Sequence, residues 1–216
     1  MLVGERMTRP VLSVSPDTPI QDALVRMRKA RVSRFPVLNK KGKLIGIVSE
    51  DDLLHASPSD ATSLSVWEIN YLMSKITVER VMTTDVITVT EDTPLEEAAR
   101  IMADHRVGGL PVVRGKAVVG MITQTDLFCL FLEMLGAREP GLRLTALVKE
   151  EPGMLHRLTK AIDEAGGNIV ALSTFAGQSS EDREVTLKVN EMDEQTLRKV
   201  LLPLLIEIKD LREINF

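Results

Sequence analysis

The chain has 216 residues, of which 44% are hydrophobic, 27% are charged and only 3% are aromatic. This composition is typical of a globular protein with an aliphatic core and excludes an intrinsically disordered chain. Acidic residues exceed basic ones, 31 against 27, and no long basic run occurs, so the sequence does not indicate a nucleic-acid-binding surface.

Cysteine and histidine are too few and too scattered for a disulfide framework or a metal cluster. The single Cys129 cannot form an internal disulfide, and the three histidines stand apart at 55, 105 and 156. The first residues lack the apolar stretch of a signal peptide, and the longest apolar stretch, near 127–135, is too short to cross a bilayer. We therefore expect a cytoplasmic protein that binds no metal, membrane or nucleic acid.

An internal repeat organises the first two thirds of the chain. Its two copies align at a constant offset of 75 residues over about thirty positions, and the offset falls to 74 after a polar turn that is shorter in the second copy. The matching pairs are Met7 with Met82, Thr18-Pro19 with Thr93-Pro94, Met27 with Met102, Arg31-Val32 with Arg106-Val107, and Pro36-Val37 with Pro111-Val112.

Each copy predicts the same elements: a short strand, a helix, two strands and a second helix. The first helix should begin at a threonine cap, Thr18 or Thr93, with the following proline at the first helical position. Apolar residues then recur at helical spacing and give one buried stripe. The last helix should begin at Ser49 or Thr123. Strands are expected at 11–14, 35–38 and 44–48 in the first copy and at 86–89, 110–113 and 118–122 in the second.

A third unit follows a linker at 136–141. Alternating apolar residues predict a strand from 142 to 148, and Pro152-Gly153 opens an apolar-striped helix that Gly166-Gly167 stops. Two further strands are expected at 168–175 and 183–190, then a helix from about 193 to the break at Pro203, and a last strand at 207–214. The order is βαββαβ, which is ferredoxin-like, so the whole chain is assigned to the α/β (α+β) class.

The start of the last helix in each copy has two interpretations. Ser49 with Asp52, and Thr123 with Asp126, fit a capping box that needs no ligand. The same geometry can hold a nucleoside, because free helix N–H groups attract phosphate and a first-turn carboxylate can accept both hydrogens of a ribose diol. The second copy is the better nucleotide site, since Glu50 and Asp51 place negative charge in the first.

Two copies of Gly-apolar-apolar-Ser/Thr-x-x-Asp, each downstream of an apolar-Pro-Val strand, resemble a tandem pair of CBS domains, the Bateman module. The resemblance assigns residues 1–62 to the first CBS repeat and 63–135 to the second. The segment 64–72 is similar to the inter-repeat helix of the acetoin utilization (AcuB) family.

This resemblance implies a regulatory adenine nucleotide, AMP, ADP or ATP, or an adenosyl metabolite such as S-adenosylmethionine. Arg31, Arg34, Lys43 and Arg106 could neutralise phosphates. The implied nucleotide-binding residues are Thr123 and Asp126 with Thr84, Asp85, Val86, Gly109, Leu110 and Pro111 in the second copy, and Ser49 and Asp52 with Arg9, Pro10, Val11, Arg34, Phe35 and Pro36 in the first.

Residues 142–216 resemble an ACT domain, through the loop that leads into the first helix and the glycine pair before the second strand. Family members more often carry Asp where this chain has Glu151. The resemblance implies dimerisation or the binding of a small metabolite such as an amino acid. Its implied ligand site comprises Glu151, Pro152, Gly153, Met154, Leu155 and Asn168.

The sequence thus predicts a regulatory ligand sensor that forms a homodimer and acts on a partner enzyme. The alternative is a structural adaptor that dimerises and holds a partner enzyme without sensing a ligand. An enzymatic role is disfavoured, because no nucleophile, base and oxyanion-binding set can be assembled from the motifs, and no catalytic cofactor is expected.

Overall fold

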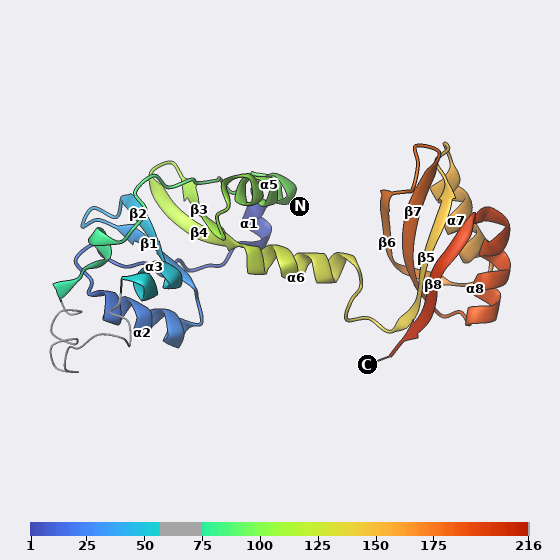
Figure 1. Cartoon of the computed structure of the whole chain (residues 1–216), viewed down its shortest axis with the longest axis horizontal. Coiled ribbons are helices and arrows are strands. Elements are labelled where there is room, and N and C mark those ends of the chain that lie inside the picture. The colour runs from blue at the N-terminus through green and yellow to red at the C-terminus, as the bar shows by residue number, and fades with distance from the viewer. Residues whose placement is uncertain (57–74, 216) are drawn as a thin grey trace. The chain divides into compact units, whose positions relative to one another are not determined.

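A computed structural model describes residues 1–56 and 75–215, which form two compact units, Met1–Leu127 and Phe128–Phe216 (Figure 1). The predicted inter-repeat helix at 64–72 lies outside the described residues. Within the described ranges, no helix is both long and apolar enough to traverse a lipid bilayer.

The first unit contains the two copies of the repeat, each built around an antiparallel hairpin with helices beside it (Figure 1). The predicted strand pairs and the helices that follow them are confirmed. The elements of the first copy are α1 (Val3–Arg6), α2 (Ile20–Ala30), β1 (Arg34–Leu38), β2 (Leu44–Ser49) and α3 (Glu50–His55). Those of the second are η1 (Val78–Arg80), α5 (Leu95–His105), β3 (Gly109–Arg114), β4 (Ala117–Thr123) and α6 (Gln124–Met134).

Helices α2 and α5 begin one residue later than predicted. Pro19 and Pro94 take the N-cap position rather than the first helical one, each with an extended ψ of 143°, and no side chain caps either helix. The preceding threonines close the upstream turn instead. Thr93 Oγ1 accepts a 3.1 Å hydrogen bond from the N–H of Thr90, and the Thr18 hydroxyl makes a 3.1 Å contact three residues back. A hydroxyl engaged in that turn is directed away from the helix N–H groups.

The strands predicted at 11–14 and 86–89 are each reduced to a single parallel bridge, at Val14 and at Val89. Val14 N–H donates to the Pro36 carbonyl at 3.2 Å, and Leu38 N–H donates to Val14 at 2.9 Å. The next bond of a parallel ladder would run from the N–H of residue 36 to Leu12, and proline has no N–H. Val89 meets the same obstacle at the proline of the second copy, so the run before it stays irregular.

A segment near the start of each copy pairs with the hairpin of the other copy. Thr8 forms an antiparallel bridge with Met121 in β4, and Thr83 forms the equivalent bridge with Ile47 in β2. This exchange places the start of the first copy beside the capping box of the second, and the start of the second beside the capping box of the first.

Two glycines make this exchange possible. A Cβ on Gly46 would lie 2.5 Å from Sδ of Met82 and 3.1 Å from the carbonyl oxygen of Thr83. A Cβ on Gly120 would overlap Sδ of Met7. The aligned Gly and Met pairs of the two copies are therefore partners in space across the copies, and a side chain at either glycine would overlap the methionine in its present position.

The second unit is a four-stranded antiparallel sheet with α7 and α8 on one face (Figure 1). Its strand order, β6-β7-β5-β8, is that of the split βαβ fold, so the predicted βαββαβ order is confirmed. The elements are β5 (Gly141–Lys149), α7 (Met154–Glu164), β6 (Asn168–Ala176), β7 (Asp182–Asn190), α8 (Glu194–Leu201), η2 (Leu202–Leu204) and β8 (Glu207–Ile214).

The core of the second unit lies between the sheet and its helices. Alternate residues of β5 and β7 point into it, as the period of two requires, and α7 and α8 each contribute one apolar stripe. The fully packed residues include Leu144, Leu187, Leu158, Ile162 and Leu197, each exposed by 2% or less.

Candidate functional site

Among the described residues of the first unit, two cavities are each lined by residues of both copies of the repeat. Cavity 1 has a volume of about 190 Å³ and cavity 2 one of about 310 Å³. Cavity 1 is lined by Thr8, Pro10, Val11, Leu12, Arg31, Val32, Ser33, Arg34, Met121, Thr123, Thr125 and Asp126. Cavity 2 is lined by Arg34, Ile47, Ser49, Asp51, Asp52, Thr83, Asp85, Val86, Ile87, Arg106, Val107, Gly108, Gly109 and Leu110.

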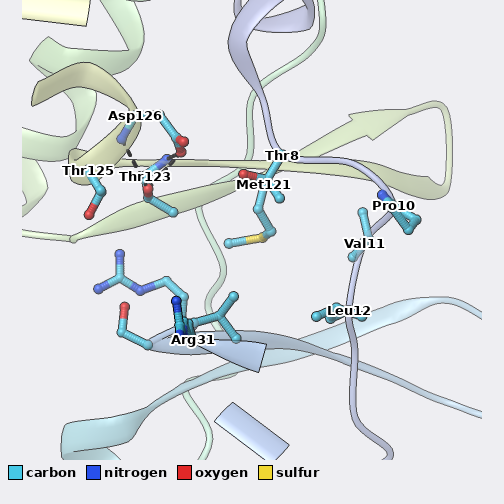
Figure 2. A pocket seen from close by; sticks show the side chains of 12 residues that line it. Thr8, Pro10, Val11, Leu12, Arg31, Met121, Thr123, Thr125 and Asp126 are labelled. Carbon is cyan, nitrogen blue, oxygen red and sulfur yellow. Dashed lines mark hydrogen bonds between the residues drawn. The ribbon is translucent and has the colours of Figure 1, made fainter. Parts of the chain in front are cut away.

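Cavity 1 is built around the junction of β4 and α6. Figure 2 shows Thr123 and Asp126 on one side of it, with Leu12 and Arg31 opposite. The N–H of Thr123 donates to Oδ2 of Asp126 at 2.8 Å, the Thr123 hydroxyl donates to the same oxygen at 2.7 Å, and Asp126 N–H donates back to Oγ1 at 3.4 Å. The capping interpretation is therefore confirmed here. These bonds use Oδ2, which leaves Oδ1 to accept a hydrogen from a ligand.

Cavity 2 repeats this geometry at the junction of β2 and α3. The N–H and hydroxyl of Ser49 donate to Oδ2 of Asp52 at 2.8 and 2.7 Å, and Asp52 N–H donates to Ser49 Oγ at 3.2 Å. The hydroxyl–carboxylate pair is thus preserved in both copies, although α3 has only six residues and α6 has eleven. The two cavities also differ in the charge of their walls.

Cavity 1 carries more positive than negative charge, and cavity 2 the reverse. Two arginines, Arg31 and Arg34, face one carboxylate in cavity 1. Cavity 2 is lined by Arg34 and Arg106 against three carboxylates, which belong to Asp51, Asp52 and Asp85. A phosphate is therefore better accommodated in cavity 1.

Arg34 reaches from β1 to the glycine pair that opens β3. A Cβ on Gly109 would lie 2.6 Å from its Nη1, so the side chain fits there because residues 108 and 109 have none. The guanidinium of Arg34 therefore lies beside this glycine pair. Partial burial lowers the pKa of Arg34, while Asp51 and Asp52 act in the opposite direction, and the group stays protonated.

The structure distributes the predicted nucleotide residues differently from their assignment by copy. Asp85, Val86, Gly109 and Leu110 line cavity 2 together with the Ser49–Asp52 pair, whereas Thr123 and Asp126 face Arg34 in cavity 1. Five predicted residues line neither cavity: Phe35, Pro36 and Pro111 are buried in their strands, and Arg9 and Thr84 are exposed outside both. Thr8, Leu12, Thr125 and Asp51 line the cavities and were not predicted as contacts.

The offset of the repeat identifies the residues that take part in the exchanged arrangement but not their partners. The aligned residues Met7 and Met82 lie in the opening segments of their copies, and each copy holds a glycine on its second hairpin strand. The sequence alone does not determine whether each methionine packs against the glycine of its own copy or against that of the other copy. That choice depends on tertiary packing, which periodicity does not report.

A third cavity, of about 340 Å³, lies at the predicted ligand loop of the second unit. Glu151, Gly153, Met154 and Leu155 line it, together with residues of β5, β6 and β7. Pro152 does not line it. Asn168 lies in a separate shallow groove beside α7 and donates from Nδ2 to Oδ1 of Asn190 at 3.0 Å.

Cavity 3 is bordered by charges of both signs. Glu151 forms an ion pair with Arg157, and Glu150 forms one with Arg183. Gly153 sits between β5 and α7 with φ +81°, a backbone conformation that side chains disfavour. A Cβ there would face open space up to Arg157 Nη1 at 3.6 Å, so an added side chain would project toward this region.

Comparisons with known proteins match the first unit and the start of the second. The sequence profile of the CBS domain family matches residues 3–59 and 78–133. Protein MJ1426 of Methanocaldococcus jannaschii is 33% identical over 152 residues, which is 59% of this chain and 89% of that protein.

Solved structures agree with this match. The crystal structure of a protein named as an acetoin utilization protein (AcuB), from Vibrio cholerae, is 31% identical, with a TM-score of 0.52, and the similarity covers 64% of this chain and 96% of that one. The CBS domain pair of protein MJ0100, in complex with 5′-methylthioadenosine and S-adenosyl-L-methionine, is 28% identical with a TM-score of 0.52, covering 64% of this chain and 98% of that one. With its duplicated hairpins and matched family profile, the chain belongs to the CBS domain family.

Proposed function

We propose that the chain is a regulatory sensor whose first unit binds adenosine derivatives in cavities 1 and 2. The observation that carries this proposal is the duplicated hydroxyl–carboxylate pair, Thr123–Asp126 and Ser49–Asp52, each at the wall of a cavity. The MJ0100 domain pair, which is similar in fold, is described in complex with two adenosine derivatives. That similarity supports the same class of ligand here.

The chemistry of the walls fits a nucleoside. Oδ1 of Asp126 can accept a hydrogen from a ribose hydroxyl while Oδ2 keeps its contacts with Thr123. Apolar side chains on the opposite side of cavity 1, including Val11 and Leu12, can pack against a base. In cavity 2, Ile47, Val86 and Leu110 supply the corresponding apolar surface.

The charge difference divides the ligands between the cavities. Cavity 1, with Arg31 and Arg34, takes a phosphorylated adenine nucleotide such as AMP. Cavity 2, with its three carboxylates, takes an adenosyl ligand without phosphate, such as 5′-methylthioadenosine or S-adenosylmethionine. Binding would regulate a partner enzyme by shifting the population of conformations.

Calorimetric titration of the full chain with AMP, ADP, ATP, S-adenosylmethionine and 5′-methylthioadenosine tests the proposal. We expect saturable binding of at least one phosphorylated and one unphosphorylated ligand. Adenosine-free controls, inorganic phosphate and ribose 5-phosphate, should bind far more weakly, because they lack the base. A chain that binds none of the five adenosine compounds would instead support the adaptor role.

For the second unit we propose an ACT domain that binds an amino acid in cavity 3. The βαββαβ order and the position of the cavity at the β5–α7 turn support this assignment. An amino acid carries both charges, and the cavity wall offers Glu150 and Glu151 to its ammonium group and Arg183 to its carboxylate. Glu151 must exchange its contact with Arg157 for the ligand.

We also propose that the protein acts as a homodimer in the cytoplasm. Helix α6 exposes Phe128, Phe131 and Met134 by 50% to 61%, more apolar surface than one helix face needs. The unpaired Cys129 suits a reducing compartment.

A further inference from the structure

Arg34 lines both cavities of the first unit. Its position in the repeat, 75 residues before Gly109, is held by glycine in the second copy. The two copies therefore differ at this position, because the first copy has a guanidinium where the second has no side chain. A single guanidinium, from the first copy alone, extends over the second copy's glycine pair.

The Arg34 side chain can respond to charge on either side. Within residues 1–56 and 75–215 its guanidinium makes no hydrogen bond or ion pair, so no fixed partner holds it in place. Asp51 and Asp52 of cavity 2 attract it through space. Cavity 1 has a second cation, Arg31, in its wall, and a phosphate bound there would attract the Arg34 guanidinium from that side.

We propose that Arg34 couples the two cavities, so that an anionic ligand in cavity 1 and a cationic ligand in cavity 2 favour each other's binding. This inference rests on the proposed binding of adenosine derivatives. A phosphate in cavity 1 draws the guanidinium toward it and leaves Asp51 and Asp52 without their neighbouring positive charge. A cationic ligand in cavity 2 then finds a more negative site.

The effect of a ligand in cavity 2 on the affinity of cavity 1 must equal the effect in the opposite direction. S-adenosylmethionine carries a net positive charge, so in cavity 2 it replaces Arg34 beside Asp51 and Asp52 and releases the guanidinium toward cavity 1. Thermodynamic linkage then requires that S-adenosylmethionine raise the affinity for AMP by the factor with which AMP raises the affinity for S-adenosylmethionine. Uncharged 5′-methylthioadenosine has the same base and ribose without the positive charge, and does not displace Arg34.

The test is a calorimetric titration of the full chain with AMP, alone and in the presence of saturating S-adenosylmethionine or 5′-methylthioadenosine. We expect S-adenosylmethionine to raise the affinity for AMP by about fivefold or more. We expect 5′-methylthioadenosine to change it by less than twofold, since no charge enters cavity 2.

Two variants separate coupling from binding. Arg34→Gln should bind AMP more weakly and lose the effect of S-adenosylmethionine. Arg31→Gln, which removes a cation from cavity 1 only, should also weaken AMP binding but keep that effect. Circular dichroism and thermal melting verify that both variants are folded, and both changed side chains reach a cavity surface rather than the packed core.

The outcomes distinguish this inference from the function on which it rests. If neither AMP nor S-adenosylmethionine binds the wild type, the proposed function fails. If both bind and Arg34→Gln shows the same coupling as the wild type, or if S-adenosylmethionine and 5′-methylthioadenosine act alike, the role of Arg34 is wrong. Competition between AMP and S-adenosylmethionine for one site would overturn it as well.

Discussion

The carboxylate of Asp126 can cap a helix and bind a ligand at the same time, because each role uses a different oxygen. Oδ2 completes the capping box with Thr123, whereas Oδ1 is left for a ligand. Capping and ligand binding were alternatives in the sequence, and the geometry makes them compatible. The same is true of Asp52, but its neighbours Glu50 and Asp51 add negative charge to that helix start.

Alanine substitutions of Asp126 and Asp52 should distinguish the two cavities by their different effects on nucleotide affinity. We expect Asp126→Ala to weaken binding of a phosphorylated adenine nucleotide by about 1.5–3 kcal/mol, because a charge-assisted contact to the ribose is lost. Asp52→Ala should have a smaller effect on the same ligand, since cavity 2 disfavours phosphate. Isothermal calorimetry with AMP measures both.

Both truncations also remove a capping contact, so each should lower the free energy of unfolding by about 0.5–2 kcal/mol. Asp126→Asn is the control, because its amide oxygen can still accept from Thr123 while the negative charge is gone. It should retain more of the folding stability than Asp126→Ala and still bind AMP weakly. Equal losses of AMP affinity in the two alanine variants, or none in either, would contradict the proposed asymmetry.

At the scale of elements, the sequence predicted most of the fold and only part of the site. Constant offsets and helical periodicity located α2, α5 and both hairpins, because both signals can be read from the order of residues along the chain. The strand predicted before the first helix of each copy does not form, because its partner strand carries a proline, Pro36 or Pro111, that has no N–H to donate. This cause lies in the pairing with another segment and not in the sequence of the strand itself. The division of Thr123 and Asp85 between two cavities depends on the exchanged leading segments, which no local pattern reports.

The exchange can be tested at its tightest point, where Gly46 of β2 meets Met82. We expect Gly46→Val to lower the free energy of unfolding by about 1–3 kcal/mol, because its side chain overlaps Met82 Sδ and approaches the Thr83 carbonyl. In the double variant with Met82→Ala, the space left by the methionine should accommodate the valine side chain and reduce this loss of stability. Chemical denaturation of the four proteins gives the coupling free energy, which would be zero if the two residues were not in contact.

At the scale of the whole molecule, the two units have separate cores. The buried core residues of the second unit come from β5, α7, β7 and α8, with partly buried residues of β6 and β8 packed against them, and cavity 3 is lined by residues of the same unit. Cavities 1 and 2 are lined by residues of the first. A change in one core should therefore leave ligand binding in the other unit intact.

Gly153→Val tests this independence together with the amino-acid site. We expect it to abolish the rise in melting temperature that an amino acid gives the wild type, because the side chain would extend into cavity 3 beside Arg157. Binding of adenosine derivatives should be unchanged, as calorimetry with AMP would measure.

Gly166→Val is the matched control. Gly166 has the same φ of +81° and open space around it, but it does not line cavity 3, so it carries the same backbone strain without filling the site. It should lower the melting temperature and leave the amino-acid response in place. A response that survives Gly153→Val would place the site elsewhere. If none of the twenty amino acids shifts the wild-type melting temperature, Glu151 is committed to Arg157 and the second unit does not sense amino acids.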